Sequence, residues 1–175
     1  METRRGIDVV LIGRERWGDE NLALRYLATA LLKEGHEARI LPLNGPGDLE
    51  GITAAVLRLG PPLVGLSMSD PDGAIDALAL ARMLRKQGYE GIITCGGALA
   101  TLTRFELLET HPDIDSVVRH DGEIPIVAMA DAVLSGKDFS AIPGLTTRSG
   151  DILPAAVYDP MPLATRPLRK NRLPE

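Results

Sequence analysis

Two short segments of small and polar residues could bind a ligand together. The first is Ser67-Met68-Ser69 and the second is the pair Gly96-Gly97, with residues 70–95 between them. A serine hydroxyl can donate and accept hydrogen bonds, and glycines let a bound molecule pass close to the backbone. Each segment alone is also typical of a helix cap or a tight turn. Their spacing favours ligand binding by both segments.

The segment from Arg14 to Asp19 is bulky and charged, and it contains Glu15, Arg16, Trp17 and Gly18. A loop that wraps the phosphate of FMN or NAD is dense in Gly, Ser or Thr, because its backbone N–H groups must reach the phosphate. The side chains of this segment would block that approach. One interpretation is a solvated surface loop. The other is a wall against a large planar ligand, which the tryptophan favours because the chain has only one Trp, three Tyr and two Phe.

The composition excludes several classes of function. The chain has 175 residues and a net charge of −5, whereas a nucleic-acid-binding domain normally carries a basic face. Cys95 is the only cysteine, so the chain alone can form neither a disulfide nor a cysteine-ligated zinc or iron–sulfur site. No segment resembles a signal peptide or a membrane span. We therefore expect a cytoplasmic protein with no nucleic acid and no membrane as partners, in which Cys95 is buried and has no catalytic role.

Short aliphatic runs alternate with amphipathic stretches along the chain, a pattern typical of parallel strands covered by helices. We expect an α/β fold of the flavodoxin-like (Rossmann-like) doubly wound class, with a parallel five-stranded sheet in the order 2-1-3-4-5. The expected strands are Ile7–Ile12, Ala38–Leu43, Leu63–Ser67, Gly91–Cys95 and Ser116–Val118. The expected helices run from Asp19 to about Gly35, from Asp48 to about Leu59, from Gly73 to about Gln87, from Thr103 to Thr110 and from Pro125 to Leu134. Thr103 and Glu106 are expected to form a capping box.

The chain changes character from Val157 onward, where prolines and basic residues recur. We expect an α/β domain over residues 1–143, an accessory hairpin over 144–158 and a proline-rich basic connector, an extended arm, over 159–175. The hairpin strands are expected at Leu145–Thr147 and Ile152–Leu153, outside the main sheet.

In a doubly wound sheet, ligands bind outside the carboxyl ends of the strands, where the strand order reverses. The loops at this edge follow the first, third and fourth strands and cover residues 13–20, 67–72 and 96–101. These loops contain the three segments described above. The fold is therefore expected to bring those segments to one site.

The spacing of Ser67-Met68-Ser69 and Gly96-Gly97 resembles the S-x-L…GG pattern of cobalamin-binding domains, with serine in place of the usual third residue. Over about residues 6–158 the chain is similar to the domain at the head of cobalamin-dependent radical S-adenosylmethionine enzymes. Three stretches carry this likeness: Asn21-Leu22-Ala23-Leu24-Arg25-Tyr26-Leu27-Ala28, Cys95-Gly96-Gly97-Ala98-Leu99-Ala100-Thr101-Leu102 and Asp115-Ser116-Val117-Val118-Arg119-His120-Asp121-Gly122-Glu123. In the third stretch, His120 and Asp121 depart from the family's Val-Val-Arg-Gly-Glu-Gly-Glu.

The resemblance implies that the cofactor is cobalamin, as methylcobalamin or hydroxocobalamin, with its nucleotide tail between the sheet and the helices. The implied cofactor-binding residues are Glu15, Arg16, Trp17, Gly18, Asn21, Leu22, Ser67, Met68, Ser69, Gly96, Gly97, Ala98, Leu99, Thr101, Arg119, His120, Gly122 and Glu123. The D-x-H-x-x-G sequence, whose histidine binds cobalt in other cobalamin domains, is missing. Arg16 stands roughly in place of that histidine, and arginine does not ligate metals in practice. We therefore expect base-off, His-off cobalamin with no protein ligand to cobalt.

The chain also lacks the CxxxCxxC sequence that binds a [4Fe–4S] cluster. The resemblance implies that the cluster and S-adenosylmethionine belong to a partner or missing domain. This chain would then carry and position a corrinoid for a radical S-adenosylmethionine methyltransferase or related enzyme, with no catalytic residue of its own. The alternative is a flavodoxin-like protein-interaction or regulatory domain without a cofactor. A small methyltransferase that binds S-adenosylmethionine directly is disfavoured, because the first loop is not glycine-rich.

Overall fold

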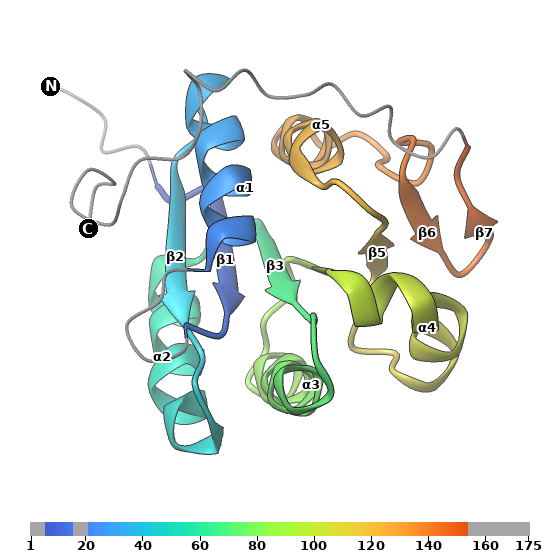
Figure 1. Cartoon of the computed structure of the whole chain (residues 1–175). Helices are drawn as coiled ribbons and strands as arrows, with labels where there is room; N and C mark the ends of the chain where they lie inside the picture. The colour runs from blue at the N-terminus through green and yellow to red at the C-terminus, as the bar shows by residue number, and fades with distance from the viewer. Residues whose placement is uncertain (1–5, 16–20, 154–175) are drawn as a thin grey trace, which may run out of the picture.

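The computed structural model describes residues 6–15 and 21–153, which form one sheet flanked by helices (Figure 1). The strands are β1 (Val9–Gly13), β2 (Ala38–Pro42), β3 (Leu63–Ser67), β4 (Ile92–Gly96), β5 (Ser116–Val118), β6 (Leu145–Thr147) and β7 (Gly150–Asp151). The helices are α1 (Leu22–Lys33), α2 (Leu49–Leu59), α3 (Pro71–Lys86), α4 (Ala98–Thr110) and α5 (Glu123–Leu134), with a 3-10 turn, Pro46–Asp48, before α2. Within the described ranges, no helix is long and apolar enough to cross a membrane.

The strand order is β2-β1-β3-β4-β5-β6-β7. The first five strands are parallel, and β1 pairs with both β2 and β3. The expected flavodoxin-like order of these five strands is therefore confirmed. Because these strands are parallel, the carboxyl ends of β1, β3 and β4 lie at one edge of the sheet, and the strand order reverses at β1.

The expectation that the hairpin lies outside the main sheet is wrong. Strand β6 pairs antiparallel with β5, with Leu145 opposite Val118, and β7 (Gly150–Asp151, not Ile152–Leu153) extends the sheet further. The physical reason is the burial of Leu145, which packs in the same apolar cluster as Met129 of α5. The domain boundaries at 143/144 and 158/159 stay predictions, and the expected arm lies outside the described residues.

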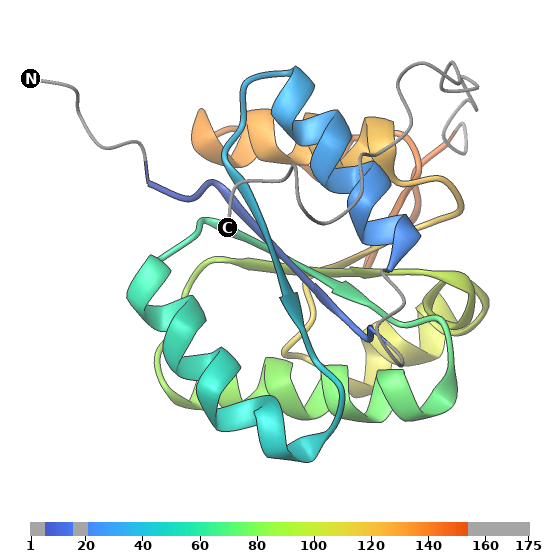
Figure 2. The same ribbon diagram turned by 60° about the vertical axis from the view of Figure 1, so that its left-hand side comes forward.

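Helices α1 and α5 cover one face of the sheet, and α2, α3 and α4 cover the other (Figure 2). Alternate residues of a strand point to opposite faces. Val9 and Leu11 of β1 therefore pack with α1 and α5, whereas Val10 and Ile12 pack with α2 and α3. All four are at most 1% exposed. Strands buried on both faces have continuous apolar sequences, which is why they could be located from the sequence.

Two helices begin after residues that cap them with a side chain. At α1, the side-chain oxygen of Asn21 accepts a hydrogen bond from the backbone N–H of Leu24 (3.2 Å). The expected cap, Asp19, lies outside the described residues. At α3, the carboxylate of Asp70 accepts a hydrogen bond from the N–H of Gly73 (2.9 Å), so this helix begins before the expected residue.

Helix α4 begins at Ala98, not at the expected capping box of Thr103 and Glu106. Thr103 lies inside the helix, where its hydroxyl donates a hydrogen bond to the backbone oxygen of Leu99 (2.9 Å). Threonine can bond one turn back within a helix as readily as it can cap one, so the sequence pattern is ambiguous. The consequence is that Gly97 stands directly at the start of a helix.

Asp151 of β7 fixes the hairpin to the domain. Its carboxylate accepts hydrogen bonds from Nε and Nη2 of Arg104 on α4 (2.9 and 3.0 Å) and from the hydroxyl of Thr146 (2.6 Å). It also lies 3.6 Å from Nη1 of Arg119, which follows β5. These interactions, above all the hydrogen bonding to Arg104, lower the pKa of Asp151 to about 2. One carboxylate thus joins β7 to α4 and to the end of β5.

We expect Asp151→Asn to lower the free energy of unfolding by about 1–2 kcal/mol at neutral pH, because the charge-assisted pair with Arg104 is lost. A carboxyl whose pKa is lowered by folding stabilises the fold above its unfolded pKa of ~3.9, and this contribution disappears as the pH falls towards the folded pKa. The stabilities of wild type and variant should therefore converge between about pH 4 and about pH 2. Urea denaturation across this range measures the effect, with Glu109→Gln, on the exposed surface of α4, as the control. A gap that stays constant down to pH 2 would contradict the prediction.

Candidate functional site

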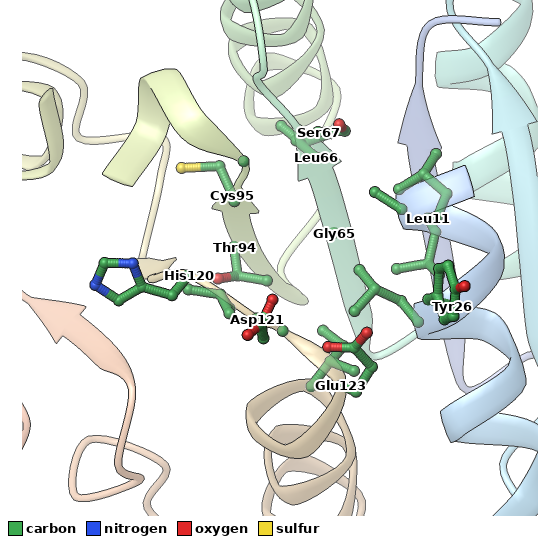
Figure 3. Close-up of a pocket in the computed structure, with 18 of the residues that line it drawn as sticks. Leu11, Tyr26, Gly65, Leu66, Ser67, Thr94, Cys95, His120, Asp121 and Glu123 are labelled. Carbon is green, nitrogen blue, oxygen red and sulfur yellow. The ribbon is translucent and has the colours of Figure 1, made fainter. Parts of the chain in front are cut away.

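A cavity of about 430 Å³ lies between the sheet and helices α1 and α5 (Figure 3). Its lining includes Ser67, Ser69, Gly96 and Gly97, at the edge where β3 and β4 end. Cavities of ~300–1,000 Å³ are typical of sites for small molecules and cofactors. The site expected from the strand order and the loop sequences therefore contains a cavity of suitable size.

Glycine on a central strand makes room for this cavity. Gly65 of β3 lies opposite Leu11 of β1 and Thr94 of β4, and all three residues line the cavity. A Cβ atom on Gly65 would lie 2.9 Å from Cδ2 of Leu11 and 4.0 Å from Cδ1 of Ile126. A side chain at this position would therefore occupy space between the sheet and α5.

Helices α1 and α5 form the walls of the cavity. Leu24 and Leu27 of α1 and Ile126 of α5 contribute apolar side chains, and Leu24 and Ile126 are each only 2% exposed. Tyr26 on the α1 side and Glu123 at the start of α5 add polar groups at less buried positions (Figure 3). The walls are therefore mostly apolar.

The two segments first singled out in the sequence lie in direct contact. The backbone N–H of Met68 donates a hydrogen bond to the oxygen of Gly96 (2.7 Å), and the N–H of Ala100 donates to the oxygen of Met68 (3.3 Å). Gly97 has a φ of +102°, and a Cβ atom there would lie 2.9 Å from both the Met68 carbonyl oxygen and Oγ of Ser69. Only glycine fits this position without a movement of the backbone.

The polar groups of the cavity are mainly hydroxyls and carboxylates. They come from Tyr26, Ser67, Ser69, Thr94, His120, Asp121 and Glu123. Among the lining residues that the structure describes, there is no lysine or arginine. The hydroxyl of Thr94 is already engaged, since it donates to the backbone oxygen of Ser116 (3.2 Å) and accepts from Oγ of Ser116 (2.9 Å).

The structure brings part of the expected set of cofactor-binding residues together. Those that line the cavity are Ser67, Ser69, Gly96, Gly97, His120, Gly122 and Glu123. Those that do not are Glu15, Asn21, Leu22, Met68, Ala98, Leu99, Thr101 and Arg119. Arg16, Trp17 and Gly18 lie outside the described residues.

Several of the residues away from the cavity have roles in the fold. Arg119 is only 5% exposed, and its guanidinium donates to the backbone oxygen of Ile152 in the hairpin. The side chain of Met68 is fully buried in the apolar cluster on the α2–α4 face. Asn21, besides capping α1, donates from Nδ2 to the backbone oxygen of Arg14 (3.1 Å). A part for these residues in ligand binding stays a prediction.

Sequence reasoning missed much of the lining, which also includes Leu11, Leu24, Tyr26, Gly65, Thr94, Asp121 and Ile126. A signal existed for two of them. Gly65 interrupts an aliphatic strand, which often marks a close approach, and it shares a face with Ser67 two residues on. Thr94 likewise shares a face of its strand with Gly96, which lies two residues on. The helix residues gave no signal, because leucine or isoleucine beside a cavity looks like ordinary core in a sequence.

A family model described as B12 binding domain matches residues 19–130. Among curated proteins, the chain is similar to "Uncharacterized methyltransferase PH0819" of Pyrococcus horikoshii, with 25% identity over 158 residues. That match covers 81% of this chain and 34% of the relative.

Solved structures of the cobalamin-dependent S-adenosylmethionine radical enzyme OxsB share the fold. The structure with aqua-cobalamin and S-adenosylmethionine bound has a TM-score of 0.70 and 18% identity, and the match covers 86% of this chain and 22% of the enzyme. For the structure with aqua-cobalamin bound, the TM-score is 0.68 at 18% identity, with 83% and 21% covered. The chain thus spans about a third of the curated relative and about a fifth of the solved enzyme.

We expect Gly97→Ala to lower the free energy of unfolding by about 2–4 kcal/mol, because it adds both backbone strain and a clash with the Met68 carbonyl. Gly60→Ala is the matched control. Gly60 also has a positive φ, +59°, but no atom lies within 4 Å of its added Cβ, so it should lose only about 1 kcal/mol. Urea denaturation measures both losses, and the excess at Gly97 combines the clash with the greater strain of its backbone conformation (φ +102°, ψ 173°), which is largely restricted to glycine. Equal losses would contradict a steric role for the Gly97–Met68 contact.

Cys95 is 1% exposed, and burial raises the pKa of its thiol to about 12. The thiolate is the reactive form of cysteine. We therefore expect an aromatic disulfide reagent at pH 8 to modify the folded chain over ~1,000-fold more slowly than the chain in urea. Absorbance of the released thiolate measures both rates. Rapid modification of the folded chain would show that Cys95 is accessible, contrary to the prediction.

Proposed function

This chain belongs to the B12-binding domain family, and we propose that the cavity between the sheet and helices α1 and α5 holds the nucleotide tail of cobalamin. In this proposal the cobalamin is base-off and His-off, so that neither its own base nor a histidine of this chain binds cobalt. The observation that carries the proposal is the cavity with glycines in its floor, directly beside the Ser67–Ser69 and Gly96-Gly97 segments.

The residues present fit such a tail. A flat base joined to ribose and phosphate needs a passage without side chains and with apolar surfaces for the base. Gly65 and Gly96 supply the floor, since an added Cβ would lie 2.9 Å from Leu11 at the first position and 3.4 Å from the Val118 carbonyl oxygen at the second. The hydroxyls of the Ser67–Ser69 segment supply hydrogen-bond partners for polar atoms of the tail.

The sequence between β1 and α1 supports the His-off state, because residues 14–21 include no histidine. In the proposed binding mode, a base held between the sheet and the helices is not free to bind cobalt. His120 follows β5, and its backbone N–H donates to Oγ1 of Thr101 (3.3 Å). We infer that its imidazole contacts the rim of the corrin.

The loop after β1 is proposed to face the lower side of cobalt. The guanidinium of Arg14 pairs with the carboxylate of Asp76 (3.1 Å), and the backbone oxygen of Arg14 accepts from Asn21 (3.1 Å). The hydrogen bond from Asn21 joins the two ends of the loop, and the ion pair holds Arg14 against α3. Arg16 and Trp17 lie between them in the sequence, outside the described residues, and we propose that they cover the lower side of the cofactor.

When bound, cobalamin supplies a cobalt centre that can carry a methyl group, and the protein supplies its position and surroundings. We infer that this chain presents the cofactor to a radical S-adenosylmethionine catalytic domain, within a longer polypeptide or on a separate subunit. The names of the OxsB structures and of the curated methyltransferase support this inference, as does the partial coverage of both. That domain would bind S-adenosylmethionine and the [4Fe–4S] cluster, because this chain has a single, buried cysteine.

After incubation with hydroxocobalamin and desalting, the chain is expected to retain corrinoid with the absorbance spectrum of the base-off form. In the cobalt(II) state, its electron paramagnetic resonance spectrum should lack splitting by a nitrogen ligand. Gly96→Val places a side chain in the cavity beside Val118 and should weaken binding at least ~10-fold. Gly51→Ala is the control, since it lies on the exposed face of α2 with no atom within 4 Å of the added Cβ.

Each result has one meaning. A folded chain that retains no corrinoid would contradict the proposal and favour a cofactor-free interaction domain. Retained corrinoid with nitrogen splitting would contradict the base-off, His-off state. Unchanged binding by Gly96→Val would show that the tail does not enter this cavity.

A further inference from the structure

The deep end of the cavity differs in chemistry from its edge. Leu11, Gly65 and Thr94 form a row across β1, β3 and β4. This row lies two residues, or ~6.6 Å, further from the carboxyl edge than the row of Ser67 and Gly96. The hydroxyl of Ser67 is available at the outer row, whereas in the inner row Gly65 lies between Leu11 and Thr94, with the aliphatic side chain of Ile126 from α5 nearby.

The deep row contains one polar side chain, and its hydrogen bonds are already made. The single O–H of Thr94 donates to the backbone oxygen of Ser116 (3.2 Å), and its oxygen accepts from Oγ of Ser116 (2.9 Å). Both residues are at most 1% exposed. A hydroxyl oxygen has two lone pairs, so Thr94 can accept one further hydrogen bond and can donate none. The side chains of Leu11, in the row, and of Ile126, near Gly65 on α5, offer neither donor nor acceptor.

We propose that this deep end selects corrinoids by their lower base and prefers 5,6-dimethylbenzimidazole to adenine. The inference rests on the proposed burial of the nucleotide tail and deepens it by naming the base. Both bases are joined to ribose through the five-membered ring, so the six-membered ring enters furthest. In dimethylbenzimidazole this ring carries only C–H and methyl groups, which match the surroundings of Leu11 and Ile126.

Adenine would bring polar groups that the deep row cannot pair. Its six-membered ring carries an amino group with two N–H donors and two ring nitrogens that accept. Thr94 could accept from one N–H, but no side chain in the row can donate to the ring nitrogens. An unpaired buried polar group forfeits its hydrogen bonds to water, which corresponds to a loss of affinity of about 5- to 100-fold.

The test compares three corrinoids by isothermal titration calorimetry with the wild-type chain: cobalamin, its analogue with adenine as lower base, and cobinamide, which has no nucleotide base. We expect cobalamin to bind at least ~10-fold more tightly than the adenine analogue. We also expect cobinamide to bind more weakly than cobalamin, because it leaves the deep end unfilled.

Two variants at one position separate size from polarity. Gly65→Ala narrows the deep end and should weaken the binding of both base-containing corrinoids about 10-fold, with little effect on cobinamide. Gly65→Ser adds a hydroxyl on the same carbon, and this hydroxyl can form a hydrogen bond with adenine. The ratio of the affinities for cobalamin and its adenine analogue should therefore be several-fold smaller in Gly65→Ser than in Gly65→Ala. Gly51→Ala on α2 should leave all three affinities unchanged.

The outcomes distinguish this inference from the proposed function. Equal affinity for cobalamin and its adenine analogue, with weaker cobinamide binding, would leave tail burial intact and overturn base selection. Equal affinity for cobalamin and cobinamide would overturn tail burial itself. If Gly65→Ala and Gly65→Ser prefer cobalamin to its adenine analogue by the same factor, polarity is not the cause of the preference. If either variant fails to fold, the affinities of the wild-type chain for the three corrinoids still decide whether the base is selected.

Discussion

The site depends on one close backbone approach, between Gly97 and the carbonyl group of Met68. With φ at +102° and 2.9 Å between an added Cβ and the Met68 oxygen, this position admits no side chain. The contact fixes the loop after β3 against the first turn of α4, which begins at the next residue. Because Ser69 lies in this loop and Ser67 ends β3 just before it, the same contact helps to set where two of the cavity's hydroxyls lie. Packing at one glycine thus determines the geometry of the ligand-facing edge.

A cavity of this kind must coexist with a well-packed core. The α2–α4 face of the sheet is closely filled, with Val64, Met68 and Leu80 fully buried. On the other face, α1 and α5 pack in one apolar cluster with residues of β1, β5 and β6, and Gly65 and Gly96 leave space between these helices and the sheet. Glycine removes volume without adding a polar group, so the hollow disrupts little of the surrounding packing.

The stretch after β5 divides its residues between fold and site. Arg119 turns its guanidinium to the hairpin and to Asp151, where charge and hydrogen bonds hold β6 and β7 against the domain. His120, the next residue, adopts a φ of +57° and lines the cavity with Asp121. The stretch from Asp115 to Glu123, which resembles a family signature, therefore contains neighbouring residues with different roles. Arg119 stabilises the hairpin, whereas His120 lines the cavity.

The sequence by itself determined the doubly wound sheet, its order over five strands and the edge at which a ligand would lie, because strands buried on both faces leave long apolar runs and parallel connections permit few orders. It also indicated Ser67, Ser69, Gly96 and Gly97, because of their spacing and their place at the carboxyl ends of two strands. Only the tertiary structure decided that β6 joins the sheet, that Arg119 serves the hairpin, and that Leu11, Gly65, Thr94 and Ile126 share one deep surface. The reason is physical: these outcomes depend on which side chains meet across strands and helices distant in sequence, and local periodicity carries no information about such contacts.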